Sequence, residues 1–195
     1  YSIVVMSATA ACQYTMPPEE LRRRSFEIRI NDDINTDELA SRLVLAGYSR
    51  YDQVDGSSQF AIRGGIIDIF PPYLDEPVRL ELWGDTVDTI SSFDLDTQRR
   101  TSSLDKIKIT PASEVLFDNR DKLVKRIDAL AKSLKGKAIK AREKLYADID
   151  RLNGSANPTC IDKYLPLCYE SNGVFDYLDA GLFVFESARV PNIVH

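Results

Sequence analysis

Hydrophobic and polar residues alternate strictly from Val78 to Trp83, which predicts a β-strand whose two faces differ in character. The apolar face carries Val78, Leu80 and Leu82. The opposite face carries Arg79, Glu81 and Trp83. Trp83 is the only tryptophan of the chain, and an indole beside an arginine is typical of the energetic centre of a protein-binding surface. We therefore expect the first face to be a core and the second to be a candidate binding surface.

A second alternating segment adds a fourth residue to this candidate surface. Phe60 and Ile62 are predicted to point inward, and Ala61 and Arg63 outward. The following Gly64 and Gly65 predict a bulge or a close backbone approach. If Gln59–Arg63 pairs with the strand that carries Arg79, then Arg63, Arg79, Glu81 and Trp83 form one cluster. The alternative is that the arginines pair with Glu81 while Trp83 covers an adjoining helical domain.

The neighbouring segments predict an antiparallel sheet with one solvated face. Alternation over residues 26–30 indicates a half-buried strand, and Asn35 before an apolar helical pattern indicates a capped helix that stops at Gly47. Further strands are expected over residues 48–54, 59–70, 78–83, 86–95 and 106–110. The pair Gly84-Asp85 predicts a two-residue hairpin turn.

The two ends of the chain follow a different pattern. Residues 2–6 and 182–185 predict buried strands, the second of them parallel, and two amphipathic helices separated near Gly136 are expected after residue 111. Their apolar stripes are predicted to be Leu123, Ile127, Leu130 and Leu134, then Ala141, Leu145, Ile149 and Leu152. We therefore predict one α/β domain interrupted by an inserted α+β module.

Composition is ordinary for a globular protein: 44% of the 195 residues are hydrophobic and 28% are charged. No apolar run is long enough to cross a bilayer, and the opening run lacks the basic flank of a signal peptide, so we expect a cytosolic protein. The net charge is -5, which disfavours nonspecific nucleic-acid binding. Residues 121–144 are locally basic; we expect a solvated helix face there, with a phosphate contact as the alternative.

Candidate chemistry is sparse. The single histidine is His195, and three widely spaced cysteines indicate buried thiols, not a disulfide framework or a zinc site. The acidic residues match no metal-ligand spacing, and the chain contains neither a phosphate-binding loop nor a nucleophile elbow. The sequence therefore predicts no catalytic site, no metal and no cofactor.

Three segments carry a family resemblance. Residues 60–72 (FAIRGGIIDIFPP), 79–85 (RLELWGD) and 93–99 (FDLDTQR) resemble the module shared by the nucleotide-excision-repair helicase subunit UvrB and the bacterial transcription-repair coupling factors, the Mfd family. Ala61, together with segments 97–99, 141–145, 164–167 and 175–178, favours the coupling factors.

This resemblance implies a fold and a role. It implies that residues 26–112 form a docking module for UvrA, the damage-recognition ATPase, and that residues 1–25 and 113–195 belong to a degenerate helicase-like (RecA-like) domain without ATPase activity. Arg63, Arg79, Glu81 and Trp83 then occupy the positions that contact UvrA, with Trp83 in place of the usual phenylalanine.

The resemblance also implies what lies outside this chain. RNA polymerase and DNA would be bound only through other domains of a parent ATP-dependent translocase, and a C-terminal domain of that parent would mask the docking face. The expected function is non-catalytic recruitment of UvrA for nucleotide excision repair at stalled RNA polymerase. The alternative is a nucleic-acid-binding accessory domain of a UvrB-type repair helicase.

Overall fold

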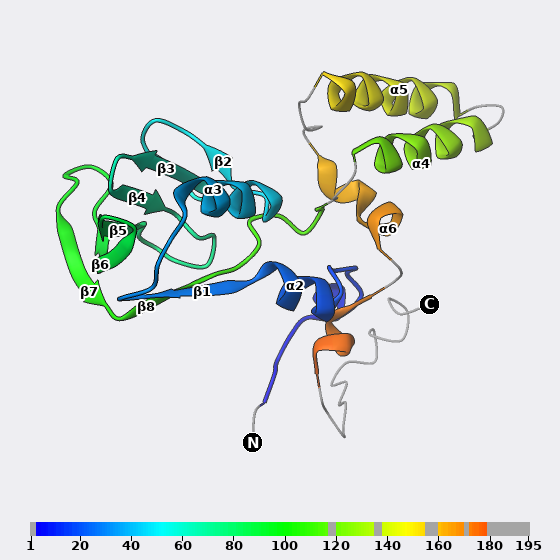
Figure 1. Ribbon diagram of the computed structural model, residues 1–195. Helices are drawn as coiled ribbons and strands as arrows, with labels where there is room; N and C mark the ends of the chain where they lie inside the picture. Colours follow the sequence, from blue (N-terminus) through cyan, green and yellow to red (C-terminus); the bar gives the residue numbers. More distant parts are fainter. Residues whose placement is uncertain (1–2, 117–119, 135–137, 155–159, 170–171, 179–195) are drawn as a thin grey trace. The chain divides into compact units, whose positions relative to one another are not determined.

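A six-stranded β-sheet forms the centre of residues 19–116 in the computed structural model (Figure 1). The structure describes residues 3–116, 120–134, 138–154, 160–169 and 172–178. The chain divides into two compact units, Glu19–Leu116 and Tyr1–Pro18 with Phe117–His195. The sheet belongs to the first unit.

The strand order in this sheet is β2-β3-β4-β5-β6-β7. The strands are β2 (Ser49–Arg50), β3 (Gln59–Arg63), β4 (Ile66–Ile69), β5 (Val78–Trp83), β6 (Thr86–Phe93) and β7 (Arg100–Leu104). All neighbours are antiparallel except β2 and β3, which run parallel. The predicted antiparallel sheet is thus confirmed, with one parallel pair at its edge.

Two strand predictions in this region were wrong. Residues 59–70 form two strands, because the chain reverses at Gly64, which adopts φ +60, and at Gly65. Only Ser49–Arg50 of the expected strand at 48–54 is extended and paired. Strand β7 was not expected at all, since its sequence RTSSL is almost fully exposed and shows no apolar alternation.

A two-stranded sheet and the helices α2 and α3 complete the first unit. Strand β1 (Phe26–Arg29) pairs antiparallel with β8 (Lys106–Ile109), and the short helix α2 (Pro18–Arg24) precedes β1. Helix α3 (Thr36–Leu45) begins where Asn35 Oδ1 accepts hydrogen bonds from the backbone amides of Asp37 and Glu38, both at 3.0 Å. Gly47, at φ +92, ends this segment as predicted.

One apolar core holds these elements together. It contains Leu39 and Leu43 of α3, and Leu80 of β5, the last two with no exposed surface. Because β5 presents Val78 and Leu80 to this core, its apolar side is the inner face of the sheet, against which α3 packs (Figure 1). The face of the sheet that carries Arg79 and Glu81 is called the outer face below.

The second unit is helical in its described part. Its helices are α1 (Ala8–Ala11), α4 (Arg120–Ser133), α5 (Ile139–Asn153) and α6 (Leu165–Cys168), with 3-10 turns η2 (Ile161–Tyr164) and η3 (Val174–Tyr177). Helices α4 and α5 bury the predicted Leu123, Ile127, Ile149 and Leu152, but Ala131 replaces Leu130 in the stripe and Ala141 is exposed. Within the described ranges, no helix has both the length and the apolar character needed to span a membrane.

The predicted strand at the start of the chain does not form. From Ile3 to Met6 the backbone is neither helical nor extended in a sheet, and Ile3 and Val5 are 89% and 90% exposed. A buried parallel strand needs neighbouring strands, and the described part of this unit supplies only one isolated bridge, between Tyr14 and Gly173. The predicted strand at 182–185 and the break at Gly136 lie outside the described residues.

The cysteines differ from the prediction as well. Cys12 and Cys160 are exposed and only Cys168 is half-buried. Cys12 caps the four-residue helix α1, in which no residue is buried. The prediction that all three thiols are buried was therefore wrong for Cys12 and Cys160.

Candidate protein-interaction face

The register of the central strands brings the predicted residues onto the outer face, but not in the arrangement that the sequence suggested. Strand β4 lies between β3 and β5, so Arg63 and Arg79 are not on adjacent strands. Instead, Asp68 of β4 is aligned with Ala61 on one side and with Arg79 on the other. Gln59–Arg63 does not pair directly with the strand that carries Arg79, which was the condition for grouping Arg63 with the other three residues.

Asp68 is the residue that joins the two arginines. Its side chain is 1% exposed, and its Oδ2 accepts a hydrogen bond of 2.6 Å from Arg63 Nη2. Arg79 donates to both carboxylate oxygens, from Nε to Oδ1 at 2.7 Å and from Nη2 to Oδ2 at 2.9 Å. A buried carboxylate with two guanidinium partners is well compensated, because both oxygens accept charged hydrogen bonds.

Arg79 also contacts Gln98 and Phe93. Its Nη2 also donates to Gln98 Oε1 at 2.9 Å, and its guanidinium carbon lies 4.3 Å from the ring centre of Phe93. The side chain is only 14% exposed, and the hydrogen bonds to Asp68 raise the pKa of Arg79. We call Arg63, Asp68, Arg79 and Gln98 the Asp68 cluster. Arg79 is therefore part of the outer layer of the fold as well as a candidate contact.

Glu81 forms its ion pair with neither Arg63 nor Arg79. It forms an ion pair with Arg100 of β7 and accepts a hydrogen bond of 3.3 Å from the Thr89 hydroxyl. The hydrogen bond and charge of Arg100 lower the pKa of Glu81 below its ordinary value, against a partial burial that acts the other way. The alternative in which Arg63 and Arg79 pair with Glu81 is therefore not what the structure shows, because both arginines pair with Asp68.

Trp83 stands at the end of β5 and is 85% exposed. The pairing of β5 with β6 shifts register between Glu81 and Leu82, and the chain then turns at Gly84, which adopts φ +63. The turn glycine is needed because side-chain-bearing residues rarely adopt this conformation. The indole at the end of this hairpin strand is thus exposed, without cover from the described part of its own unit.

The outer face is less exposed to solvent than the alternation of polar and apolar residues predicted. Ala61 is 1% exposed and belongs to a small cluster with Val54 and Phe70, against which Leu95 packs. The loops on either side of the central strands therefore cover part of this face. Asp68 and Gln98 were missed by the sequence reasoning, although an aspartate within the run Ile66–Ile69 is a sign of a buried ion pair.

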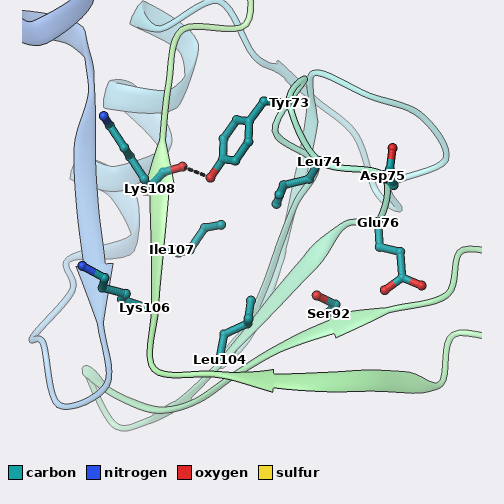
Figure 2. A pocket seen from close by; sticks show the side chains of 9 residues that line it. All are labelled: Tyr73, Leu74, Asp75, Glu76, Ser92, Leu104, Lys106, Ile107 and Lys108. Carbon is teal, nitrogen blue, oxygen red and sulfur yellow. Dashed lines mark hydrogen bonds between the residues drawn. The ribbon is translucent and has the colours of Figure 1, made fainter. Parts of the chain in front are cut away.

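A groove in the same unit is lined by residues 73–76, 92, 104 and 106–108 (Figure 2). Figure 2 shows Ile107 and Leu104 pointing into the groove, whereas the Lys106 and Lys108 side chains point away from it. The Tyr73 hydroxyl donates to the Lys108 carbonyl oxygen at 2.6 Å across the groove. The lining also includes Asp75, Glu76 and Ser92, of which Glu76 already accepts a hydrogen bond of 2.5 Å from the Thr101 hydroxyl, and we place no site there.

The remaining chemistry is limited in the described residues. No three His, Cys, Asp or Glu side chains gather in a way that could hold a metal ion there. In the second unit, Lys125, Lys140 and Lys144 are exposed on α4 and α5. These described lysines are thus accessible, which a solvated helix face and a phosphate contact both require.

Comparison with known proteins agrees with the sequence resemblance. Residues 26–115 match the family model described as the UvrB interaction domain. A transcription-repair-coupling factor of Bacillus subtilis is 41% identical over 176 residues, which cover 86% of this chain and 15% of that protein. One from Myxococcus xanthus is 32% identical over 182 residues, 91% of this chain and 15% of that protein.

A third relative matches a shorter stretch. A transcription-repair-coupling factor of Staphylococcus aureus is 36% identical over 105 residues, which cover 54% of this chain and 9% of that protein. The chain thus spans about 15% of the length of the Bacillus subtilis and Myxococcus xanthus relatives. Residues 26–115 belong to the UvrB interaction domain family, and the chain is related over most of its length to the transcription-repair-coupling factors.

Proposed function

We propose that the unit formed by residues 19–116 is a non-catalytic docking module for UvrA. The outer face of the sheet is the proposed contact surface, with Arg63, Arg79, Glu81 and Trp83 as its central residues. The match to the UvrB interaction domain supports a partner of the UvrA type.

The observation that carries the proposal is an exposed indole on the same sheet as a cationic pair. Two guanidinium groups, of Arg63 and Arg79, share the single carboxylate of Asp68, so these three side chains carry one excess positive charge. Trp83, the last residue of β5 before the hairpin turn, is 85% exposed. Tryptophan and arginine are the residues that most often dominate binding energy when a partner covers them.

The wider role follows from the relatives and is part of the proposal. We infer that the module recruits UvrA for nucleotide excision repair at stalled RNA polymerase, in the bacterial cytoplasm. Polymerase and DNA are proposed to be bound by other parts of a translocase parent, one of whose C-terminal domains masks the outer face. The flanking unit is proposed to belong to a degenerate helicase-like domain.

The test is direct binding of purified UvrA to this chain, measured by isothermal titration calorimetry. Replacing Trp83 by alanine removes a side chain that contributes little to its own fold, so the variant tests contact alone. We expect a loss of affinity of about thirtyfold, because a tryptophan anchor contributes roughly 2 kcal/mol. Tyr14→Ala is the matched control, since Tyr14 is also an exposed aromatic, 55% exposed, but lies in the other unit.

Arginine variants provide a second test of the proposed contact surface. Arg63 is 41% exposed and is expected to lose about tenfold in affinity when replaced by alanine, as a charged hydrogen bond contributes roughly 1.5 kcal/mol. Arg29→Ala is its control, because Arg29 is 62% exposed and pairs with Glu27 on the two-stranded sheet. Unchanged UvrA affinity in folded Trp83→Ala and Arg63→Ala variants would refute the proposed surface.

The exposed lysines of α4 and α5 support the second candidate, a nucleic-acid-binding accessory role. This role predicts duplex DNA binding that weakens steeply with added salt, because lysine–phosphate contacts release counterions. A Lys125→Gln, Lys140→Gln, Lys144→Gln variant is expected to lose such binding. No measurable duplex affinity of the unmodified chain at low salt dismisses this candidate.

A further inference from the structure

We infer that Asp68 is a positioning residue for the docking face: it holds the Arg63 and Arg79 guanidinium groups in the orientation in which a partner meets them. This inference rests on the proposed function. Asp68 itself is 1% exposed and cannot be a major contact for a partner. Its effect on binding must therefore pass through the two arginines.

The geometry explains how one carboxylate can orient two cations. Asp68 Oδ1 binds Arg79 Nε, and Oδ2 binds both Arg79 Nη2 and Arg63 Nη2. The two contacts to Arg79 form a bidentate pair, which fixes the plane of its guanidinium group. The ring of Phe93 lies against that plane at 4.3 Å, so rotation about the long side chain is blocked from a second direction.

The same contacts determine which atoms remain for a partner. Among the described residues, the hydrogen bonds of Arg79 use Nε and Nη2 and none uses Nη1. Arg63 uses Nη2 for Asp68, and its Nη1 makes only a long contact of 3.5 Å to the Asp52 carbonyl oxygen. One nitrogen of each guanidinium is thus left with unused or weakly used donors. A partner that accepts both would bind preorganised groups and lose little side-chain entropy.

Two variants separate positioning from a merely structural role. Asp68→Asn keeps the size of the side chain but removes its charge, and we expect about tenfold weaker UvrA binding, the effect of losing one charged hydrogen-bond anchor. Gln98→Asn is the milder variant, because asparagine tolerates the left-handed φ of +59 at this position but is too short to reach Arg79 in the same way. We expect it to stay folded and to bind about twofold to threefold more weakly.

A double-mutant comparison shows whether Asp68 acts through the arginines. In the Arg63→Ala background, Arg79 is the only one of the two arginines that Asp68 can still orient. Asp68→Asn is therefore expected to weaken UvrA binding by only about threefold instead of tenfold. An equal factor in both backgrounds would show that Asp68 does not act through Arg63. That result, or unchanged affinity in both Asp68→Asn and Gln98→Asn, overturns the inference.

A spectroscopic readout does not depend on UvrA. The Arg79 Nε–H group, which donates to a buried carboxylate, is expected to give a slowly exchanging NMR signal in the free chain, and Asp68→Asn is expected to remove that protection. Protection retained in Asp68→Asn overturns the inference. Absence of UvrA binding by the unmodified chain would instead overturn the proposed function, and this inference with it.

Discussion

Replacement of Arg79 by alanine is expected to destabilise the docking unit as well as its binding. The change removes both donors that reach Asp68 from β5, at 2.7 and 2.9 Å, and leaves that carboxylate 1% exposed with Arg63 as its remaining cation. Removing one partner of a buried ion pair costs about 3–5 kcal/mol. Because Arg63 still binds at 2.6 Å, we expect a value near the lower end, about 3 kcal/mol.

Hydrogen exchange at the amides of β4 and β5 is the appropriate assay, since it reports on this unit separately from the helical one. A loss of about 3 kcal/mol corresponds to roughly hundredfold faster exchange of the most protected amides. Arg63→Ala is the comparison, because its side chain is 41% exposed and its removal is expected to cost only about 1 kcal/mol.

The outcome decides how binding data are interpreted. If Arg79→Ala exchanges like the unmodified chain, Asp68 is not held as the geometry indicates, and the reasoning about the Asp68 cluster fails. If it exchanges a hundredfold faster, weak UvrA binding by Arg79→Ala is not evidence for a direct contact. Trp83→Ala is then the cleaner test of the surface.

Three other changes have defined outcomes. The lowered pKa of Glu81 contributes stability above its unfolded value near 4.5, which is lost as pH falls through the folded pKa. Arg100→Ala should reduce this acid loss, by at most about 1 kcal/mol, and raise the Glu81 pKa in an NMR titration. Gly47→Ala should cost about 2 kcal/mol in thermal unfolding, because φ is +92 and the new Cβ would lie 2.9 Å from a leucine carbon; an unchanged midpoint would contradict this. Tyr164→Phe removes a 2.7 Å hydrogen bond to Asp148, so α5 should lose about 1 kcal/mol of protection and the Asp148 pKa should rise. Unchanged exchange in α5 would argue against that contribution.

Alternation predicted the central strand of the sheet because one of its faces is buried. Val78 and Leu80 are 1% and 0% exposed, while Trp83 on the other face is 85% exposed. Strand β7 could not be found in the same way, because both of its faces meet solvent and its composition follows no period. The strand expected near Ile3 shows the converse: an apolar run forms a strand only when a neighbour is present to pair with it.

The candidate site was harder to predict than the strand that carries it. Alternation assigns a residue to a face, but it does not say which strand lies beside it. That neighbour depends on two chain reversals. The one at Gly64 places β4 beside β3, and the connection over residues 70–77 pairs β4 with β5 and brings Asp68 to Arg79 from 11 positions away. Glu81 was grouped correctly by face, yet its partner Arg100 comes from a strand without a recognisable pattern.

The exposure of Trp83 also provides a built-in optical signal. It is the only tryptophan of the chain, and at 85% exposure its indole is already surrounded mostly by water in the folded state. Unfolding therefore changes the fluorescence of this residue little, whereas burial beneath a partner shifts its emission to shorter wavelength. An unlabelled chain can thus be titrated with a tryptophan-free partner fragment, and the emission will report docking and hardly respond to loss of structure.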